Sequence, residues 1–267
     1  QQLKERIDGG EIGDIIAMRG YRMSRRSATC GPPPEGKTEV MHQIAKFHSF
    51  LWASGGLYSD YFIHQIDELS WMKGAWPVKA HALGGRHYRE VAGETFLDQN
   101  FDTYSVEYTY PDGTKLFYNG RAMSGCHEEF ASYVHGTKGT AIVSTSAHYP
   151  GKVRTFKDQT LESGSQIWAF PQPEPSPYQL EWDDLVAAII NDKKYNEVER
   201  GAIASMVTSM GRMAAHTGNI VTYEQMLACE HEFAPDVDKM TEDGPAPVEI
   251  KEGVYPVPKP GILKTEY

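Results

Sequence analysis

Three ionisable side chains recur at helical spacing in the segment DYFIHQID, residues 60–67. Asp60, His64 and Asp67 are four and three residues apart, so on an α-helix they would share one narrow face with Trp71. A carboxylate one turn away can orient an imidazole and raise its basicity, which suits general acid/base catalysis near neutral pH. The alternative interpretation is a half-exposed amphipathic helix that carries a capped histidine without a chemical role.

The neighbouring elements determine where this face points. The apolar positions of the segment fall on the opposite side of the predicted helix: Phe62, Ile66 and Leu69. Gly74 ends the helix, and a strand is predicted from Trp76 to Leu83. Gly84-Gly85-Arg86 follows, and we expect the backbone to turn sharply or to approach a ligand closely there.

The remaining pattern groups strands together between helices. Helices are predicted over residues 1–9, 38–52, 60–73, 178–191, 196–217 and 223–229. Strands are predicted over residues 14–23, 76–83, 101–110, 115–123, 128–134 and 139–144, with shorter ones between 146 and 176. Polar and aromatic residues alternate from Thr103 to Tyr110, and the turn at 111–114 predicts a hairpin. This order indicates an α+β fold: an open-faced, mostly antiparallel sheet with helices packed on one face.

The same pattern predicts the extent of this domain and which of its faces are buried. In helix 178–191 we expect the apolar side chains to point inward: Leu180, Leu185, Ala188 and Ile189. Residues 1–230 are predicted to form one domain, and 231–267 a proline-rich tail that wraps it. The uncovered face of the sheet is expected to be a subunit interface, which predicts a homo-oligomer.

Composition excludes several classes of function. The 267 residues are 40% hydrophobic and 23% charged, as in a soluble globular protein, and they contain no membrane-length apolar run. The net charge of -10 argues against nucleic acid and anionic membranes as partners. The three widely spaced cysteines indicate free thiols. His42 and His48 are six residues apart, so no metal site is predicted there. The 11% of aromatic residues suits stacking on sugar rings.

Several separated motifs, in order, resemble a known family. They are the D-x-x-x-H-x-x-D helix, the Pro-Val strand with Gly-Gly-Arg, GTKGTA at 136–141 and GRMAAHTGNIVTYEQML at 211–227. Together they resemble the C-terminal domain of the glucose-fructose oxidoreductase / inositol dehydrogenase / rhizopine catabolism (Gfo/Idh/MocA) family. The motifs resemble in particular those of dehydrogenase-like proteins abundant in Bacteroidetes and Planctomycetes. The resemblance runs from about Lys4 to about Cys229.

The resemblance implies a dihydrodipicolinate-reductase-like C-terminal fold and a role for each matching residue. His64 would be the acid/base on the substrate hydroxyl or carbonyl, and Asp60 would bind and orient the substrate or His64. Four further residues lie on segments that resemble the walls of the substrate pocket: Arg22, Trp52, Arg86 and Arg121. For Arg86 the alternative is an ion pair that stabilises the sheet.

The sequence also departs from the family pattern. No G-x-G-x-x-G follows a strand, and the family's catalytic lysine in an E-K-P segment is missing. The chain is therefore expected to be a C-terminal half whose parent protein binds NAD or NADP through a Rossmann domain, with no cofactor or metal in this chain itself. The compartment, cytoplasm or periplasm, stays open.

Three functions remain. The first is a substrate-binding and oligomerisation domain of an NAD(P)-dependent oxidoreductase that acts on a small carbohydrate-like molecule: a sugar, cyclitol or glycoside. The second is an NAD-dependent glycosidase of the same fold. The third, preferred for the isolated chain, is a non-catalytic binding and oligomerisation module.

Overall fold

A nine-stranded sheet forms the body of the protein in this computed structural model, which describes residues 1–267. The strand order is β10-β9-β8-β7-β1-β6-β5-β2-β11, and every neighbouring pair is antiparallel except β1 and β6. The strands are β1 Ile15–Ser24, β2 Lys79–Gly85, β5 Thr103–Thr109, β6 Lys115–Ala122, β7 Glu129–Gly136, β8 Thr140–Thr145, β9 Arg154–Phe156, β10 Gln166–Ala169 and β11 Val221–Thr222. A separate small hairpin pairs β3 Glu90–Val91 with β4 Glu94–Thr95.

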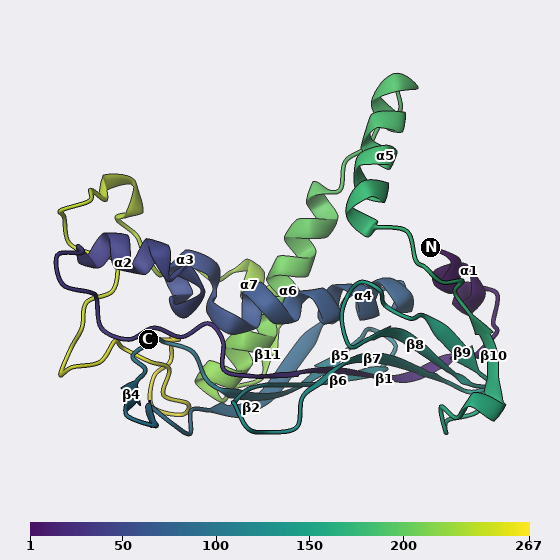
Figure 1. Ribbon diagram of the computed structural model, residues 1–267, viewed down its shortest axis with the longest axis horizontal. Helices are drawn as coiled ribbons and strands as arrows, with labels where there is room; N and C mark the ends of the chain where they lie inside the picture. The colour runs from purple at the N-terminus through teal and green to yellow at the C-terminus, as the bar shows by residue number, and fades with distance from the viewer.

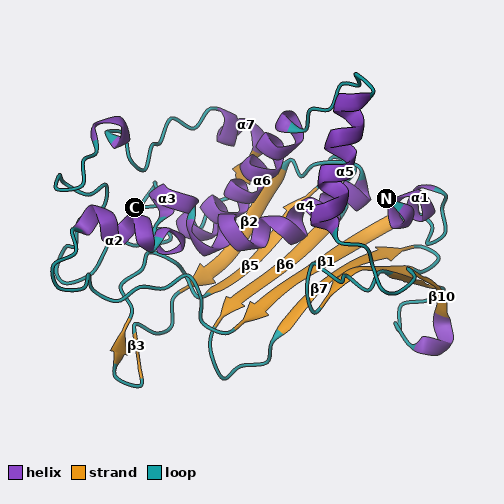
Figure 2. Cartoon of the chain, turned by 45° about the horizontal axis from the view of Figure 1, so that its top comes forward, coloured by secondary structure: helices purple, strands orange, loops and turns teal.

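The helices lie on one face of this sheet (Figure 2). They are α1 Gln2–Asp8, α2 Glu39–Ala45, α3 Leu51–Ser54, α4 Ile63–Lys73, α5 Pro177–Ile190, α6 Val198–Thr217 and α7 Tyr223–Leu227. The short turns are 3-10 helices at Phe47–Ser49 (η1), Ser163–Ser165 (η3) and Val237–Lys239 (η4), and a π-helical turn at Tyr58–Phe62 (η2). The predicted α+β class, with a mostly antiparallel sheet covered on one face, is confirmed. No helix is both long and apolar enough to cross a membrane.

Strand β5 shows how the sequence pattern builds the core between sheet and helices. Its alternation is as predicted, with Tyr104 and Tyr108 fully buried toward the helices. Each buried phenol finds a polar partner: the Tyr108 hydroxyl lies 2.9 Å from that of Tyr58, and the Tyr104 hydroxyl 3.0 Å from Nε2 of His216. Burying these rings is therefore favourable, because no phenolic hydroxyl is left without a hydrogen bond.

The helix predicted over residues 38–52 is broken, and that prediction is wrong. α2 ends at Ala45, and Phe50 has an extended backbone (φ -124°, ψ 130°) before α3 begins. The extended residue lets the Phe50 ring reach full burial against Tyr255 of the tail, with ring centroids 4.8 Å apart. Tertiary packing thus outweighs the helical periodicity of this segment. The break also redirects His48, which lies between the two pieces.

The expected turn at Gly84-Gly85 is a second correction. Both glycines belong to β2, which begins at Lys79 instead of Trp76. A Cβ added to Gly84 would lie 2.9 Å from the Phe101 ring and 3.3 Å from Cβ of Ala215. The missing side chain at Gly84 lets α6 pack closely on the strand.

Helix α5 projects away from the sheet (Figure 1). Ala188 is buried, but Leu180 is 45% exposed and Ile189 is 70% exposed, so the prediction that these two point inward is wrong. They are nine residues apart and so lie on opposite sides of the helix, and no other element of the chain covers either of them.

The tail from residue 231 to residue 267 has no regular element beyond the short turn η4. It nevertheless contributes to a second, smaller core in which Val248 and Tyr255 pack with Phe50, Leu97 and Cys30. The tail is therefore attached to the domain by buried apolar side chains as well as by hydrogen bonds.

Candidate active site

The segment that carries Asp60 and His64 begins with the π-helical turn η2, which precedes the regular helix α4. Asp60 lies within this turn and His64 in the first turn of α4. The turn is fixed to the sheet by Phe62, whose ring occupies the space that a side chain at Gly120 would fill. The wider π turn changes the relation between Asp60 and His64 that regular α-helical spacing predicts.

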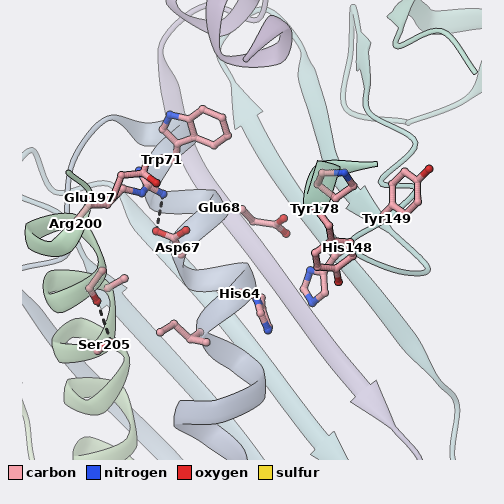
Figure 3. Close-up of a pocket in the computed structure, with 14 residues that line it drawn as sticks. His64, Asp67, Glu68, Trp71, His148, Tyr149, Tyr178, Glu197, Arg200 and Ser205 are labelled. Atoms are coloured by element: carbon pink, nitrogen blue, oxygen red, sulfur yellow. Dashed lines mark hydrogen bonds and ion pairs between the residues drawn. The ribbon is translucent and has the colours of Figure 1, made fainter. Parts of the chain in front are cut away.

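His64 faces a cleft of about 640 Å³ between α4, the first turns of α5 and α6, and the loop after β8 (Figure 3). The cleft is lined by Ile63, His64, Asp67, Glu68, Trp71, His148, Tyr149, Pro177, Tyr178, Glu197, Arg200, Gly201, Ala204 and Ser205. From the loop, the imidazole of His148 approaches that of His64, with ring centroids 4.3 Å apart. The structure thus pairs His64 with a second histidine that lies 84 positions further along the chain.

Arg22 of β1 supplies the positive charge beside these two rings. Its Nη1 lies 2.9 Å from Nε2 of His148, and since a guanidinium can only donate, Nε2 accepts this hydrogen bond. Burial and the charge of Arg22 lower the pKa of His64. Burial, His64 and Arg22 together lower the pKa of His148 to about 4. Both imidazoles are therefore neutral at pH 7 and able to accept a proton.

Glu68 lies one turn after His64 on α4 and also lines the cleft. Its Oε1 accepts a hydrogen bond of 2.6 Å from the Ser144 hydroxyl of β8. Burial of the carboxyl raises the pKa of Glu68 to about 7, although the hydrogen bond and Arg22 act in the opposite direction. A carboxyl that titrates near neutral pH, beside two neutral imidazoles, is typical of a site that moves protons.

Asp60 contacts the imidazole of His48, not that of His64. His48 also packs on Tyr61, with ring centroids 5.1 Å apart, and the guanidinium of Arg22 lies 5.5 Å from the Tyr61 ring centroid. Asp60 and His64 are therefore connected only indirectly, through Tyr61 and Arg22. No hydrogen bond joins them.

The other two members of the predicted polar stripe connect α4 to α6. Asp67 accepts a hydrogen bond of 2.6 Å from Nη2 of Arg200, and the guanidinium of Arg200 lies 5.6 Å from the Trp71 ring centroid (Figure 3). These contacts form one wall of the cleft. They hold the two helices together and leave His64 free to face the open side.

Arg86 lies outside this cleft. Its guanidinium forms a two-pronged ion pair with the fully buried carboxylate of Asp98, at 2.5 Å and 3.0 Å. It also donates to the carbonyl oxygens of Asp98 and Asn100. With its donors engaged in this way, Arg86 matches the alternative given above, an ion pair that stabilises the sheet.

Trp52 and Arg121 also lie away from His64. The Trp52 indole donates to Oε1 of Gln43 at 2.8 Å and lines a different, more apolar groove against the tail. Arg121 is on the sheet face opposite the helices, where its Nη2 donates to the carbonyl of His127 at 2.5 Å. Of the four predicted wall residues, the structure brings only Arg22 to the histidine pair.

Glu68, His48 and His148 are among the residues of the site that were not predicted. Glu68 could have been found, because it is four residues after His64 and so lies on the same helical face. His48 could not, since a continuous helix would have placed it elsewhere. His148 lies in a loop with no periodic pattern, and only the three-dimensional structure brings it to His64.

The described residues contain no group of three or more histidine, cysteine or acidic side chains that could hold a metal ion. For a dinucleotide, the chain offers no glycine-rich turn between a parallel strand and a helix, the usual cradle of a pyrophosphate. The cleft has room for a small substrate beside the planar nicotinamide ring of such a cofactor. The nucleotide part of such a cofactor would thus have to be held by other residues.

Comparison with known proteins gives a family and a fold. The sequence profile of the GFO/IDH/MocA C-terminal domain matches residues 1–142 of the 267. Levoglucosan dehydrogenase in complex with NADH and levoglucosan is similar in fold, with 15% identity over 82% of this chain and a TM-score of 0.59. None of the curated proteins compared matches the chain.

Two further solved structures share the fold. Myo-inositol 2-dehydrogenase from Lactobacillus plantarum has 23% identity over 83% of this chain, with a TM-score of 0.54. The aldose-aldose oxidoreductase from Caulobacter crescentus, complexed with glycerol, has 15% identity over 82% and a TM-score of 0.56. This chain covers 62%, 60% and 59% of the length of the three structures, respectively.

Proposed function

This chain belongs to the GFO/IDH/MocA family of oxidoreductases as a C-terminal domain, and we propose that it is the substrate-binding part of an NAD(P)-dependent enzyme that oxidises a carbohydrate-like alcohol. The substrate would be a sugar, a cyclitol or a glycoside. The observation that carries the proposal is the cleft in which His64 and His148, both neutral at pH 7, lie beside Arg22.

In this proposal His64 accepts the proton of the substrate hydroxyl, and returns it when a carbonyl is reduced. When bound, the nicotinamide supplies the hydride acceptor, and the residues of this chain bind the substrate and handle the proton. Asp60 contacts His48 and does not line the cleft, so in this proposal it orients the substrate indirectly, through the neighbouring Tyr61 and Arg22. The positive charge of Arg22 favours the alkoxide that forms as the proton leaves.

The test is steady-state NAD(P)H formation by the full-length protein with a panel of aldoses, cyclitols and glycosides. We expect His64→Asn to lower kcat/KM by about 10²- to 10⁴-fold, the usual contribution of a general base, while the affinity for the cofactor is retained. His127→Asn is the matched control, because the His127 side chain is 77% exposed in the loop between β6 and β7 and does not line the cleft. Unchanged turnover in His64→Asn would contradict the assignment.

The same assay separates the NAD-dependent glycosidase from the dehydrogenase. Release of the leaving group from a glycoside without accumulation of NADH would favour the glycosidase, in which the cofactor is regenerated within each turnover. A full-length protein that binds sugars but turns none of them over would instead favour a non-catalytic binding module.

The uncovered face of the sheet is the proposed surface for self-association. It carries large apolar side chains that are open to solvent, among them Leu83 (78% exposed) and Phe117 (42%). Covering such side chains is favourable, and a second copy of the same face is the usual partner. We expect sedimentation velocity to show an oligomer that Leu83→Lys dissociates. A monomeric protein at micromolar concentration would contradict this assignment.

A further inference from the structure

A buried ion cluster joins the last residues of the sequence to helix α6. Glu266 is 1% exposed, and Arg212 donates to both of its carboxylate oxygens, at 2.8 Å and 3.0 Å. Nδ1 of His216, one turn further along α6, lies 2.7 Å from the same carboxylate. A cluster of this kind needs every charge to be paired, since a single ion at this depth would be strongly unfavourable.

Arg212 also connects this cluster to the turn that carries Asp60. Nη1 of Arg212, the nitrogen that Glu266 does not use, donates to the hydroxyl of Ser59 at 2.5 Å and lies 3.4 Å from the carbonyl of Gly55. Ser59 precedes Asp60 within the π turn η2. One guanidinium therefore joins the tail, helix α6 and the turn of the candidate active site.

The tail is held on its other side by aromatic packing. The Tyr267 ring stacks on Phe233, with centroids 5.2 Å apart and an interplanar angle of 21°, and its hydroxyl donates to the Phe233 carbonyl at 3.1 Å. The guanidinium of Arg212 lies 5.3 Å from the Phe233 ring centroid. Glu266 is thus fixed between two parts of the tail and α6, which leaves it a single orientation.

We propose that Glu266 is a positioning residue for Asp60: it fixes the guanidinium of Arg212, and Arg212 in turn fixes Ser59 and the turn η2. The inference rests on the proposed function only in treating Asp60 as part of the active site. A guanidinium presents its donors in a rigid plane, so the two bonds to Glu266 determine where the remaining nitrogen points. Without Glu266 this plane is free to rotate, and Ser59 loses its donor.

The charge state of Glu266 supports this role. Burial alone would raise the pKa of Glu266, but Arg212 and His216 outweigh it and lower the pKa to about 2. The carboxylate is therefore ionised at every pH at which a dehydrogenase would work, and it keeps its charge pairing with Arg212 over that range.

The experiment uses the chain with labelled histidines and compares Glu266→Gln with Glu249→Gln, an exposed glutamate of the same tail. Imidazole spectra report on His48, which contacts Asp60, with the distant His135 as an internal reference. We expect Glu266→Gln to shift the His48 signals but not those of His135. Amide hydrogen exchange in η2 should become about tenfold faster. Glu249→Gln should change neither.

A second variant separates positioning from general stability. Ser59→Ala removes the link to η2 but leaves the pair of Glu266 and Arg212 intact. We expect it to shift the His48 signals with little change in the unfolding midpoint. If His48 is unchanged in folded Glu266→Gln or in Ser59→Ala, measured well below their midpoints, the proposal is wrong. These spectra need no substrate, so their outcome is independent of the turnover assay that tests the proposed oxidation.

Discussion

Two clusters of ionisable side chains lie on the helix-covered side of this protein, and they differ in how completely they are paired. In the first, Glu266 meets Arg212 and His216, and both carboxylate oxygens have charged partners. In the second, Arg22 meets His148 and His64, two imidazoles without a carboxylate on either ring.

The two clusters also differ in the pKa of the glutamate that each contains. The paired Glu266 has a pKa lowered to about 2, whereas the pKa of Glu68, at the second cluster, is raised to about 7 by burial. The first cluster therefore keeps one charge state over the whole physiological range, and the second can change its charge near neutral pH. Complete pairing fixes geometry, while incomplete pairing leaves protons free to move.

The largest expected effect comes from breaking the paired cluster. Arg212→Ala leaves the Glu266 carboxylate buried without its main partner, and we expect it to lower the free energy of unfolding by about 3–5 kcal/mol. Urea denaturation at pH 7 measures this. The double variant Arg212→Met/Glu266→Met removes both charges and should recover most of the loss. If it is as unstable as Arg212→Ala, the loss comes from packing and not from the unpaired charge.

A smaller effect of opposite sign is expected at Glu68. Its pKa of about 7 in the folded state lies above the ordinary glutamate value of 4.5, so the folded state binds the proton more tightly. Stability should then fall as pH rises from 4.5 to 7. Glu68→Gln removes this loss, and we expect it to be more stable than the natural chain by about 3 kcal/mol at pH 8 but equal to it at pH 4. A pH-independent difference would contradict the raised pKa.

The smallest expected effect is a shift in titration. Arg22→Gln removes the positive charge beside His148, whose pKa is about 4. We expect the pKa of His148 to rise by about one unit, equivalent to about 1.4 kcal/mol, and that of His64 to rise as well. Imidazole signals followed from pH 3 to 8 measure both. Burial acts in the same direction as Arg22, so the values should stay below that of a free histidine. No change in the pKa of His148 on removing Arg22 would leave burial and His64 as its causes.

The sequence was sufficient to predict the elements in which polar and apolar residues follow a regular period. The alternation of β5 predicted one polar and one aromatic face, of which Tyr104 and Tyr108 on the aromatic face are buried, and the grouping of strands predicted the mostly antiparallel sheet. The helix that contains His64 was also predicted, although its first turn is π-helical. These features depend on residues that are close in sequence, where period and turn chemistry determine structure.

What could not be predicted depends on contacts between distant segments. The break at Phe50 requires Tyr255, about 200 residues away, and the neighbour of His64 comes from a loop without a pattern. Arg86 is a second residue whose role the sequence could not predict. It lies on the motif that resembles a pocket wall, yet its partner is the buried carboxylate of Asp98. A motif identifies a segment, but the partner of each side chain is decided by tertiary packing.

The parallel pairing of β1 with β6 has a consequence for how the chain folds. β6 and β7 follow one another in the sequence, but β1 lies between them in the sheet, with Ala17 opposite both Lys115 and His135. The hairpins on either side can form from local contacts, whereas β1 must close a loop of about 100 residues to join them. Arg22 belongs to β1, the strand that joins the two hairpins. Its charge therefore reaches the two histidines only when both halves of the sheet have been joined.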